Sequence, residues 1–473
     1  MNIIFILVDS FNTEKFYGDK KTSVTPNLDR LIDSGTFFSQ AVTCAPVTLP
    51  SISSMFTSRY PFESTTLDNN LFNLNQKLPN FIEELHSNGF STHAILPEGI
   101  MHTNIPKLFH NGIFTYESFA TLYDGIGDEI IRKLNSKSMK EPWFYYIELQ
   151  DLHGHAEFVI NEGPKEFKDK KFGINQYDRM VSAFDVWIGK ITENLDLNNT
   201  LLIITADHGS SFALYSEKIE DYEKHTDEIR KHESGLAYKS AHKIITKLPG
   251  KFNPIRKKLS EAYTDNKIEN LKHKLDKELS EINNLDLSTY EKRLMRDSII
   301  RVPQPFDEHF RIPLLFVGNG VPKNKKITQQ VRSIDIFPTI FELLKLNNQF
   351  DTTGHSLLNL FDGKTHDEFP AYLDSAALRK ESQYMDTIGI RTSSLKYFRD
   401  RNETEKDASM FDLKIDVHEE NNIIQDNKDL ITKMESILES IKSDKDFKFK
   451  NIQDLSDDEV KNAKEILKDL GYV

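Results

Sequence analysis

Residues 2–10, NIIFILVDS, hold six consecutive apolar residues that end at Asp9. A short run of Ile, Phe, Leu and Val that stops at a polar turn predicts a parallel strand buried on both faces. The same pattern recurs twice, in WFYYIELQD (143–151), which ends at Asp151, and in TLLIITAD (200–207), which ends at Asp207. The sequence therefore predicts three strands whose carboxyl ends each carry an acidic side chain.

Amphipathic stretches separate the strand-like runs, which also include 91–97 and 311–318. The stretches 25–35 and 177–195 have helical periodicity; in the first, Thr25 can cap the helix, Pro26 suits its first turn and Gly35 can end it. Strands that alternate with helices predict an α/β fold, with a central mostly parallel sheet and helices on both faces. Ligands bind such sheets at the carboxyl ends of the strands, so we expect the site beside the three acids.

The composition excludes several classes of protein. The chain has 473 residues, 38% of them hydrophobic, which is enough for a sizeable core. Its net charge of −13 argues against a nucleic-acid-binding surface, although a bound metal ion would still admit an anionic substrate. Cys44 is the one cysteine, so no intrachain disulfide is possible. The sequence offers no membrane anchor and no leader peptide, which predicts a cytoplasmic protein.

The alternation of strands and helices breaks in one segment. We predict a catalytic domain over 1–375 that contains a charged helical insertion at about 214–300, with a helix at 267–282. The insertion is a solvated helical segment, an oligomerisation arm that makes a homo-oligomer, or a lid over the site. Residues 376–473 are expected to form a small α+β subdomain, with strands in 388–400 and 408–416 and a terminal helix at 457–473.

Asp9, Asp207 and His208 suit a metal ion if the strand ends converge. Two carboxylates and an imidazole form a hard oxygen and nitrogen site that fits Zn²⁺ or Mn²⁺ better than Ca²⁺. The alternative is that each acid merely caps a helix or a turn. The Asp-His-Gly sequence that closes a buried strand favours the metal.

Thr48 is the candidate nucleophile. It lies in APVTLPSISSMFTSRYP (45–61), where a helical pattern begins at the threonine. The backbone N–H groups of a helix N-terminus favour an oxyanion, and a divalent cation would lower the pKa of the hydroxyl. The alternative is that Thr48 is a simple N-cap.

Five blocks of the sequence, in order and spacing, resemble the sulfatase branch of the alkaline phosphatase superfamily. The resemblance covers nearly the whole chain apart from the insertion, and it implies that superfamily's fold. The blocks are NIIFILVDS (2–10), the segment from TPNLDRLIDSG to TSRYPF (25–62), YIELQDLHGH (146–155), IITADHGSS (203–211), and RIPLLFVGNG (311–320) with VRSIDIFPTIFELL (331–344).

The resemblance places the nucleophile nine residues before the threonine of a Thr-Gly-Arg-Tyr-Pro-like stretch, here Thr57 to Pro61, and so at Thr48. Cys44 imitates the start of the sulfatase motif Cys-x-Pro-x-Arg, but this register makes it a small buried hydrophobic residue.

Four departures distinguish the chain from typical sulfatases. Oxidation of Thr48 would give a ketone in place of the aldehyde of formylglycine. Ile52 occupies the place of the motif arginine, Ser10 replaces the second of the paired aspartates, and His208 stands where sulfatases often have Asn. In these respects the chain resembles the threonine-nucleophile members of the superfamily. By that resemblance Asp9, Thr48, Asp207 and His208 hold the first metal.

Residues 151–155, DLHGH, allow two interpretations. As the Asp-x-x-Gly-His motif of nucleotide phosphodiesterases, the segment implies a second metal bound by Asp151, His155 and a downstream histidine, for which His309 is the candidate. As the sulfatases' Asp-Pro-His, it puts His153 beside the substrate, where it can protonate the leaving group. Arg311 either binds an anion or pairs with surface acids.

These features predict a metal-dependent hydrolase of phosphate esters, either phosphodiesters or phosphomonoesters. Thr48 would form a phosphothreonine intermediate, with one or two Zn²⁺ or Mn²⁺ ions and His153 as the acid. The partner is then an anionic phosphate- or sulfate-ester substrate. The alternatives are a sulfatase that works without formylglycine, a phospho-group transferase, and a non-catalytic binding or assembly protein on the same fold.

Overall fold

The computed structural model describes residues 1–68, 71–153, 164–215, 219, 279–300, 303–364, 368–375 and 386–443. The chain forms two compact units, one of Met1–Ala213 with Val302–Val473 and one of Leu214–Arg301. The described part of the smaller unit contains α9 (Thr289–Ile300). The predicted helix at 267–282 lies outside the described residues except at its end. The expected domain boundaries stay predictions.

The larger unit is built on a nine-stranded sheet in its described part, with the order β10-β2-β9-β8-β1-β7-β5-β6 and β11 also paired with β2. All neighbouring strands are parallel except β9, which is antiparallel to both β2 and β8. The predicted α/β fold and its five strands are confirmed. The strands are β1 (Asn2–Val8), β2 (Thr36–Val42), β5 (Ser91–Pro97), β6 (Gly112–Tyr116), β7 (Trp143–Leu149), β8 (Thr200–Ala206), β9 (Arg311–Val317), β10 (Lys325–Ile327) and β11 (Val331–Arg332).

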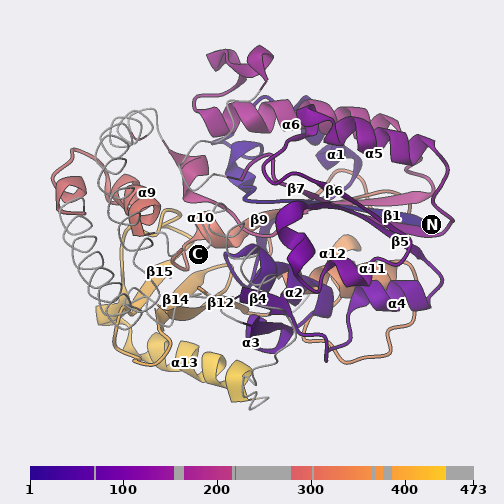
Figure 1. Ribbon diagram of the computed structural model, residues 1–473. Coiled ribbons are helices and arrows are strands. Elements are labelled where there is room, and N and C mark those ends of the chain that lie inside the picture. Colours follow the sequence, from indigo (N-terminus) through magenta and orange to yellow (C-terminus); the bar gives the residue numbers. More distant parts are fainter. Residues whose placement is uncertain are drawn as a thin grey trace, which may run out of the picture. The chain divides into compact units, whose positions relative to one another are not determined.

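Helices cover both faces of the sheet (Figure 1). One face carries α1 (Pro26–Ser34), α5 (Ile126–Asn135) and α6 (Gln176–Glu193), and the other carries α2 (Thr48–Thr57), α4 (Phe81–Ser87) and α11 (Ile336–Leu343). The predicted helices at 25–35 and 177–195 are therefore confirmed as α1 and α6. The core between the layers is aromatic: the ring of Phe5 stacks on that of Phe337, with centroids 5.5 Å apart. Shorter elements are α3 (Pro61–Ser64), β3 (Thr65–Asp68), β4 (Leu71–Leu74), α10 (Asp307–Phe310) and α12 (Leu358–Phe361).

The register of the central strands sets the level of the site. Val8, the last residue of β1, pairs with Leu149 of β7 on one side and with Ala206 of β8 on the other. Asp9 and Asp207 therefore follow adjacent strands at the same edge of the sheet. The Asp9 backbone N–H continues the ladder by donating to the Leu149 carbonyl at 2.9 Å.

A second sheet follows in the C-terminal part of the larger unit. It is antiparallel, in the order β12 (Ala371–Asp374), β13 (Thr387–Arg391), β14 (Leu395–Asp400) and β15 (Ser409–Asp412). The side chains of Met434 and Leu438, on α13 (Lys428–Ser443), belong to the same buried cluster as Ile388 and Ile390 of β13. The predicted strand segment 388–400 is in fact two strands joined by a turn. The predicted helix at 457–473 lies outside the described residues.

Two expectations about the surroundings of the protein stay predictions. Among the described helices, none is long and apolar enough to cross a membrane. The cytoplasmic location and the homo-oligomer through the insertion are expected from the sequence alone.

Candidate active site

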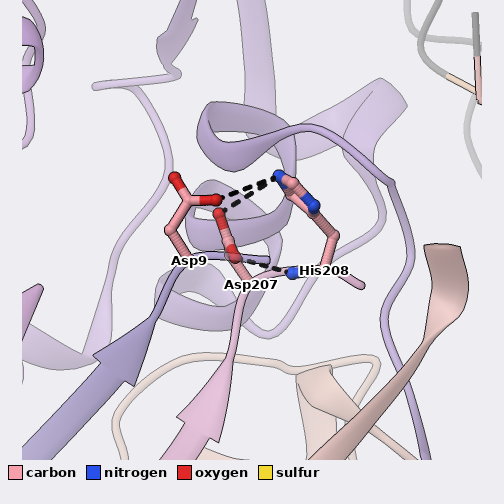
Figure 2. Close-up of side chains that lie close together, drawn as sticks. All are labelled: Asp9, Asp207 and His208. Carbon is pink, nitrogen blue, oxygen red and sulfur yellow. Dashed lines mark hydrogen bonds and ion pairs between the residues drawn. The ribbon is translucent and has the colours of Figure 1, made fainter. Parts of the chain in front are cut away.

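Asp9, Asp207 and His208 meet at the carboxyl edge of the sheet (Figure 2). Their candidate ligand atoms all lie within 4.8 Å of one another, and all three residues are buried. His208 Nε2 is 3.7 Å from Asp9 Oδ1 and 3.4 Å from Asp207 Oδ2. The convergence of side chains that the strand pattern predicted is therefore present in the structure.

Local hydrogen bonds hold the two carboxylates in place. Ser10 has a left-handed backbone, with φ of 61°, and its N–H donates to Asp207 Oδ1 at 3.2 Å. The His208 N–H donates to the same oxygen at 2.7 Å, and the Ser10 hydroxyl donates to Asp9 Oδ1 at 2.8 Å. Within the described part of the chain, Asp207 Oδ2 and His208 Nε2 make no hydrogen bond. These two buried atoms thus face each other at 3.4 Å as an ion pair without a hydrogen bond between them.

The electrostatics of the cluster show a deficit of positive charge. Burial raises the pKa of Asp9, although His208 opposes the shift. Burial and the Asp9 carboxylate raise the pKa of Asp207 to about 6. For His208, burial lowers the pKa, but the carboxylates of Asp207 and Asp9 outweigh it and the net shift is upward. The residues fit a divalent cation, which would supply the missing charge.

Thr48 lies beside this cluster at the start of α2. Its hydroxyl donates to Asp9 Oδ2 at 3.4 Å, and the residue is 5% exposed. The N-cap position belongs to Val47, so the simple N-cap interpretation of Thr48 is wrong. The hydroxyl instead faces the acids, with the positive end of the helix dipole behind it.

Ser51, one turn further along α2, was not singled out by the sequence. Its hydroxyl donates to the Asp207 backbone carbonyl at 2.7 Å and lies 2.8 Å from the Thr43 hydroxyl. This bond ties the helix that carries Thr48 to the end of β8. The sequence signal for Ser51 is its spacing of three residues from Thr48, which is about one helical turn. Its hydrogen-bond partner, the Asp207 carbonyl, is known only from the tertiary structure. Ile52, at the place of the sulfatase arginine, is fully buried.

Cys44 is not part of the site. It belongs to a buried apolar cluster with Tyr60, Ile334 and Tyr372, as predicted for a small hydrophobic residue. Burial raises the pKa of its thiol to about 12, so it is a poor nucleophile.

His153 reaches the cluster from the end of β7. Its Nε2 is 3.9 Å from Asp9 Oδ2, and its ring lies against Phe119 with centroids 5.7 Å apart. Asp151 instead accepts a hydrogen bond from the Leu122 N–H at 3.0 Å, and burial raises its pKa to about 7. Asp151 thus holds the loop that follows β6.

The second metal site stays a prediction. Among the described residues, no group of three metal-ligating side chains includes Asp151 or His309. His155 lies outside the described residues. Because β9 is antiparallel to β8, His309 on α10 does lie at the carboxyl edge, and its carbonyl accepts from the Gly209 N–H at 2.9 Å. Arg311 forms an ion pair with Glu14. Of the two alternatives predicted for Arg311, this contact matches pairing with an acid.

Comparison with known proteins identifies the family of the chain. Residues 1–243 match the sulfatase family. The chain belongs to the sulfatase family. Residues 287–444 also match the C-terminal domain of N-sulphoglucosamine sulphohydrolase, and this range contains the four-stranded sheet and α13.

Individual relatives are more distant. Arylsulfatase K of Gallus gallus is 29% identical over 135 residues, which cover 28% of this chain and 25% of that protein. The chain thus matches only about a quarter of this curated relative.

Solved structures with this fold include both sulfatase and phosphonate enzymes. The phosphonate monoester hydrolase of Agrobacterium radiobacter has a TM-score of 0.60 at 14% identity, over 94% of this chain and 95% of that one. A putative sulfatase of Bacteroides thetaiotaomicron has a TM-score of 0.59 at 16% identity, over 95% of both chains. At these identities the likeness shows a common fold.

Proposed function

We propose that the protein is a metal-dependent hydrolase of phosphate esters in which Thr48 is the nucleophile. The observation that carries this proposal is the Thr48 hydroxyl, which lies 3.4 Å from Asp9 Oδ2 at the edge of the Asp9, Asp207 and His208 cluster. Membership of the sulfatase family supports hydrolysis of an anionic ester. The fold is also that of a phosphonate monoester hydrolase, so it accommodates attack at phosphorus.

The proposed metal ligands are Asp9, Thr48, Asp207 and His208. Zn²⁺ or Mn²⁺ bound there would lower the pKa of the Thr48 hydroxyl and offset negative charge on the ester. The bonds from Ser10 and His208 N–H groups to Asp207 Oδ1 keep its other oxygen directed into the cluster. Ser51 keeps the start of α2 in register with Asp207 through the backbone carbonyl.

The reaction has two displacements at phosphorus. Thr48 Oγ1 loses its proton to solvent and attacks in line, so the bond from Oγ1 to phosphorus forms while the bond to the leaving alkoxide breaks. His153, with Nε2 3.9 Å from Asp9 Oδ2, is placed to give its proton to that alkoxide. Water then attacks phosphorus and the bond from phosphorus to Oγ1 breaks. One proton of the water restores the Thr48 hydroxyl, and His153 takes a proton back from solvent. Inorganic phosphate leaves when the substrate is a monoester, and a phosphomonoester leaves when it is a diester.

Two substitutions of Thr48 test the nucleophile. Thr48→Ala should abolish turnover and keep the fold, whereas Thr48→Ser keeps a hydroxyl and should retain measurable activity. Acid quench during turnover, followed by mass spectrometry, should find phosphate on the peptide that contains residue 48. Turnover of the alanine variant within about tenfold of the wild type would exclude Thr48 as the nucleophile.

Sulfate-ester hydrolysis is the second candidate, favoured by the family and by the match to the C-terminal domain of a sulphohydrolase. A panel of p-nitrophenyl sulfate, phosphate, phosphodiester and phosphonate substrates separates the two, because all share one leaving group. A preference for the sulfate in the metal-loaded enzyme would replace the phosphate proposal. The intact mass of the chain would show whether Thr48 is unmodified in the active protein.

A further inference from the structure

Asn12 joins three segments that surround the candidate site. It is 3% exposed and follows β1 by a few residues. Its side-chain Nδ2 donates to the Glu308 carbonyl of α10 at 2.9 Å, and its Oδ1 accepts from the Ser210 N–H at 2.8 Å. One side chain thus connects the β1 loop, the loop after Asp207 and His208, and the turn before β9.

Gly209 makes this junction tight. Its N–H donates to the His309 carbonyl of α10 at 2.9 Å. A Cβ at this position would lie 2.3 Å from the Glu308 carbonyl oxygen and 3.0 Å from Asn12 Nδ2. The loop after His208 can therefore approach α10 and Asn12 this closely only because residue 209 has no side chain.

Tyr177 holds the other side of the junction. Its hydroxyl donates to the Ser10 carbonyl at 2.6 Å and accepts from the Asn12 N–H at 3.1 Å. Ser10 in turn binds Asp207 Oδ1 through its own N–H at 3.2 Å. The backbones on both sides of the cluster are thus fixed by one buried set of bonds, which we call the Asn12 clasp: Asn12, Tyr177, Gly209 and the carbonyls of Glu308 and His309.

We propose that Asn12 is a positioning residue for the metal ligands Asp207 and His208, a role that rests on the proposed function. Asn12 is not one of the three residues of the candidate metal cluster. It acts through the backbone of residues 208–210, which determines where the imidazole of His208 points. Groups that orient metal ligands in this way typically change metal affinity by roughly ten- to a hundredfold when they are removed.

The test compares Asn12→Ala with a matched control, Asn75→Ala. Asn75 is 2% exposed and makes the same pair of bonds elsewhere, donating to the Glu63 carbonyl at 2.9 Å and accepting from the Lys77 N–H at 3.1 Å. Each full-length protein is titrated by calorimetry with Mn²⁺ and, in a separate experiment, with Zn²⁺. Hydrogen exchange at the amides of residues 208–210 is then measured without metal.

We expect Asn12→Ala to weaken Mn²⁺ binding by about tenfold or more and to speed exchange at residues 208–210. Asn75→Ala should lose comparable stability and leave both readouts within about twofold of the wild type. Unchanged exchange at residues 208–210 in Asn12→Ala, or an equal loss of Mn²⁺ affinity in both variants, would overturn the positioning role. If the wild type binds no Mn²⁺ or Zn²⁺ while exchange still rises in Asn12→Ala, the proposed function fails and the clasp is supported.

Discussion

The candidate metal cluster and the ion-pair network of the C-terminal sheet are both buried, but they differ in charge balance. In the network, Asp307 accepts two bonds from Arg391, at 2.8 and 2.7 Å, and one from Lys396 at 2.5 Å. Lys396 also lies 2.7 Å from Glu419, so two carboxylates meet two cations. Among the described residues, the ion-pair partners of Asp9 and Asp207 are imidazoles: His208 lies near both carboxylates, and His153 Nε2 lies 3.9 Å from Asp9 Oδ2.

The pKa shifts follow that difference. Burial acts to raise the pKa of Asp307, but Arg391 and Lys396 outweigh it and hold the pKa well below its usual value. For Asp207 no such cation is present among the described residues, and its pKa rises to about 6. A buried acid pair that the protein leaves unbalanced is suited to an added cation, whereas a balanced network serves the structure. The network also holds α10, which supplies the carbonyls of the Asn12 clasp.

The largest expected effect is the loss of catalysis in Asp207→Asn. Removing one metal ligand should lower kcat/KM by at least about a thousandfold, which corresponds to about 4 kcal/mol of transition-state stabilisation. The measurement is initial-rate kinetics with a Mn²⁺ titration of each protein. If Asp207→Asn kept the Mn²⁺ affinity of the wild type, the Asp9, Asp207 and His208 cluster would not be a metal site, and its proposed difference from the ion-pair network would fail.

Lys396→Met should lower the stability of the fold much more than Asp207→Asn does. It leaves Glu419 and Asp307 short of a buried cation and should lower the free energy of unfolding by roughly 3 to 5 kcal/mol. Metal-free Asp207→Asn should change it by less than about 1 kcal/mol, because the substitution relieves charge repulsion. Urea unfolding of both variants in the presence of a chelator gives the comparison. Equal losses in the two would mean that both clusters are structural.

His93 is a buried titratable group outside both clusters. Within the described structure, neither of its ring nitrogens makes a hydrogen bond. Burial, with a contribution from Lys133, lowers its pKa from 6.5 to about 4. Between these values the unfolded chain binds a proton that the folded protein does not, so stability falls as pH drops from 6.5 to about 4.

We expect this titration to cost about 2 to 3 kcal/mol across that range, and His93→Gln to lack it. The measurement is the difference in unfolding free energy between wild type and His93→Gln at several pH values from 7 down to about 4. Taking the difference removes the contributions of all other titrating groups, because the two proteins share them. A difference that stays constant with pH would show that the pKa of His93 is the same in the folded and the unfolded chain.

Much of the candidate site followed from local sequence. Apolar runs that end at Asp9 and Asp207 indicated parallel strands, and the carboxyl ends of such strands share an edge. The helical pattern beginning at Thr48 indicated a helix N-terminus, and the resemblance to the sulfatase branch, which implies a nucleophile nine residues before Thr57, indicated that Thr48 is the candidate. The signals for strands and helices are local, because a strand or a helical turn can be recognised from its own few residues.

The remaining features depend on which distant segments pack together. The antiparallel direction of β9, which brings His309 to the carboxyl edge, is a choice of strand pairing that no local period encodes. The bond from Ser51 to Asp207 and the bonds of Asn12 join residues 156, 198 and 296 positions apart. Periodicity in the sequence thus determined the strands and the acids at their ends, while tertiary packing decided which groups orient them, because a hydroxyl or an amide gains its partner only when the chain has closed.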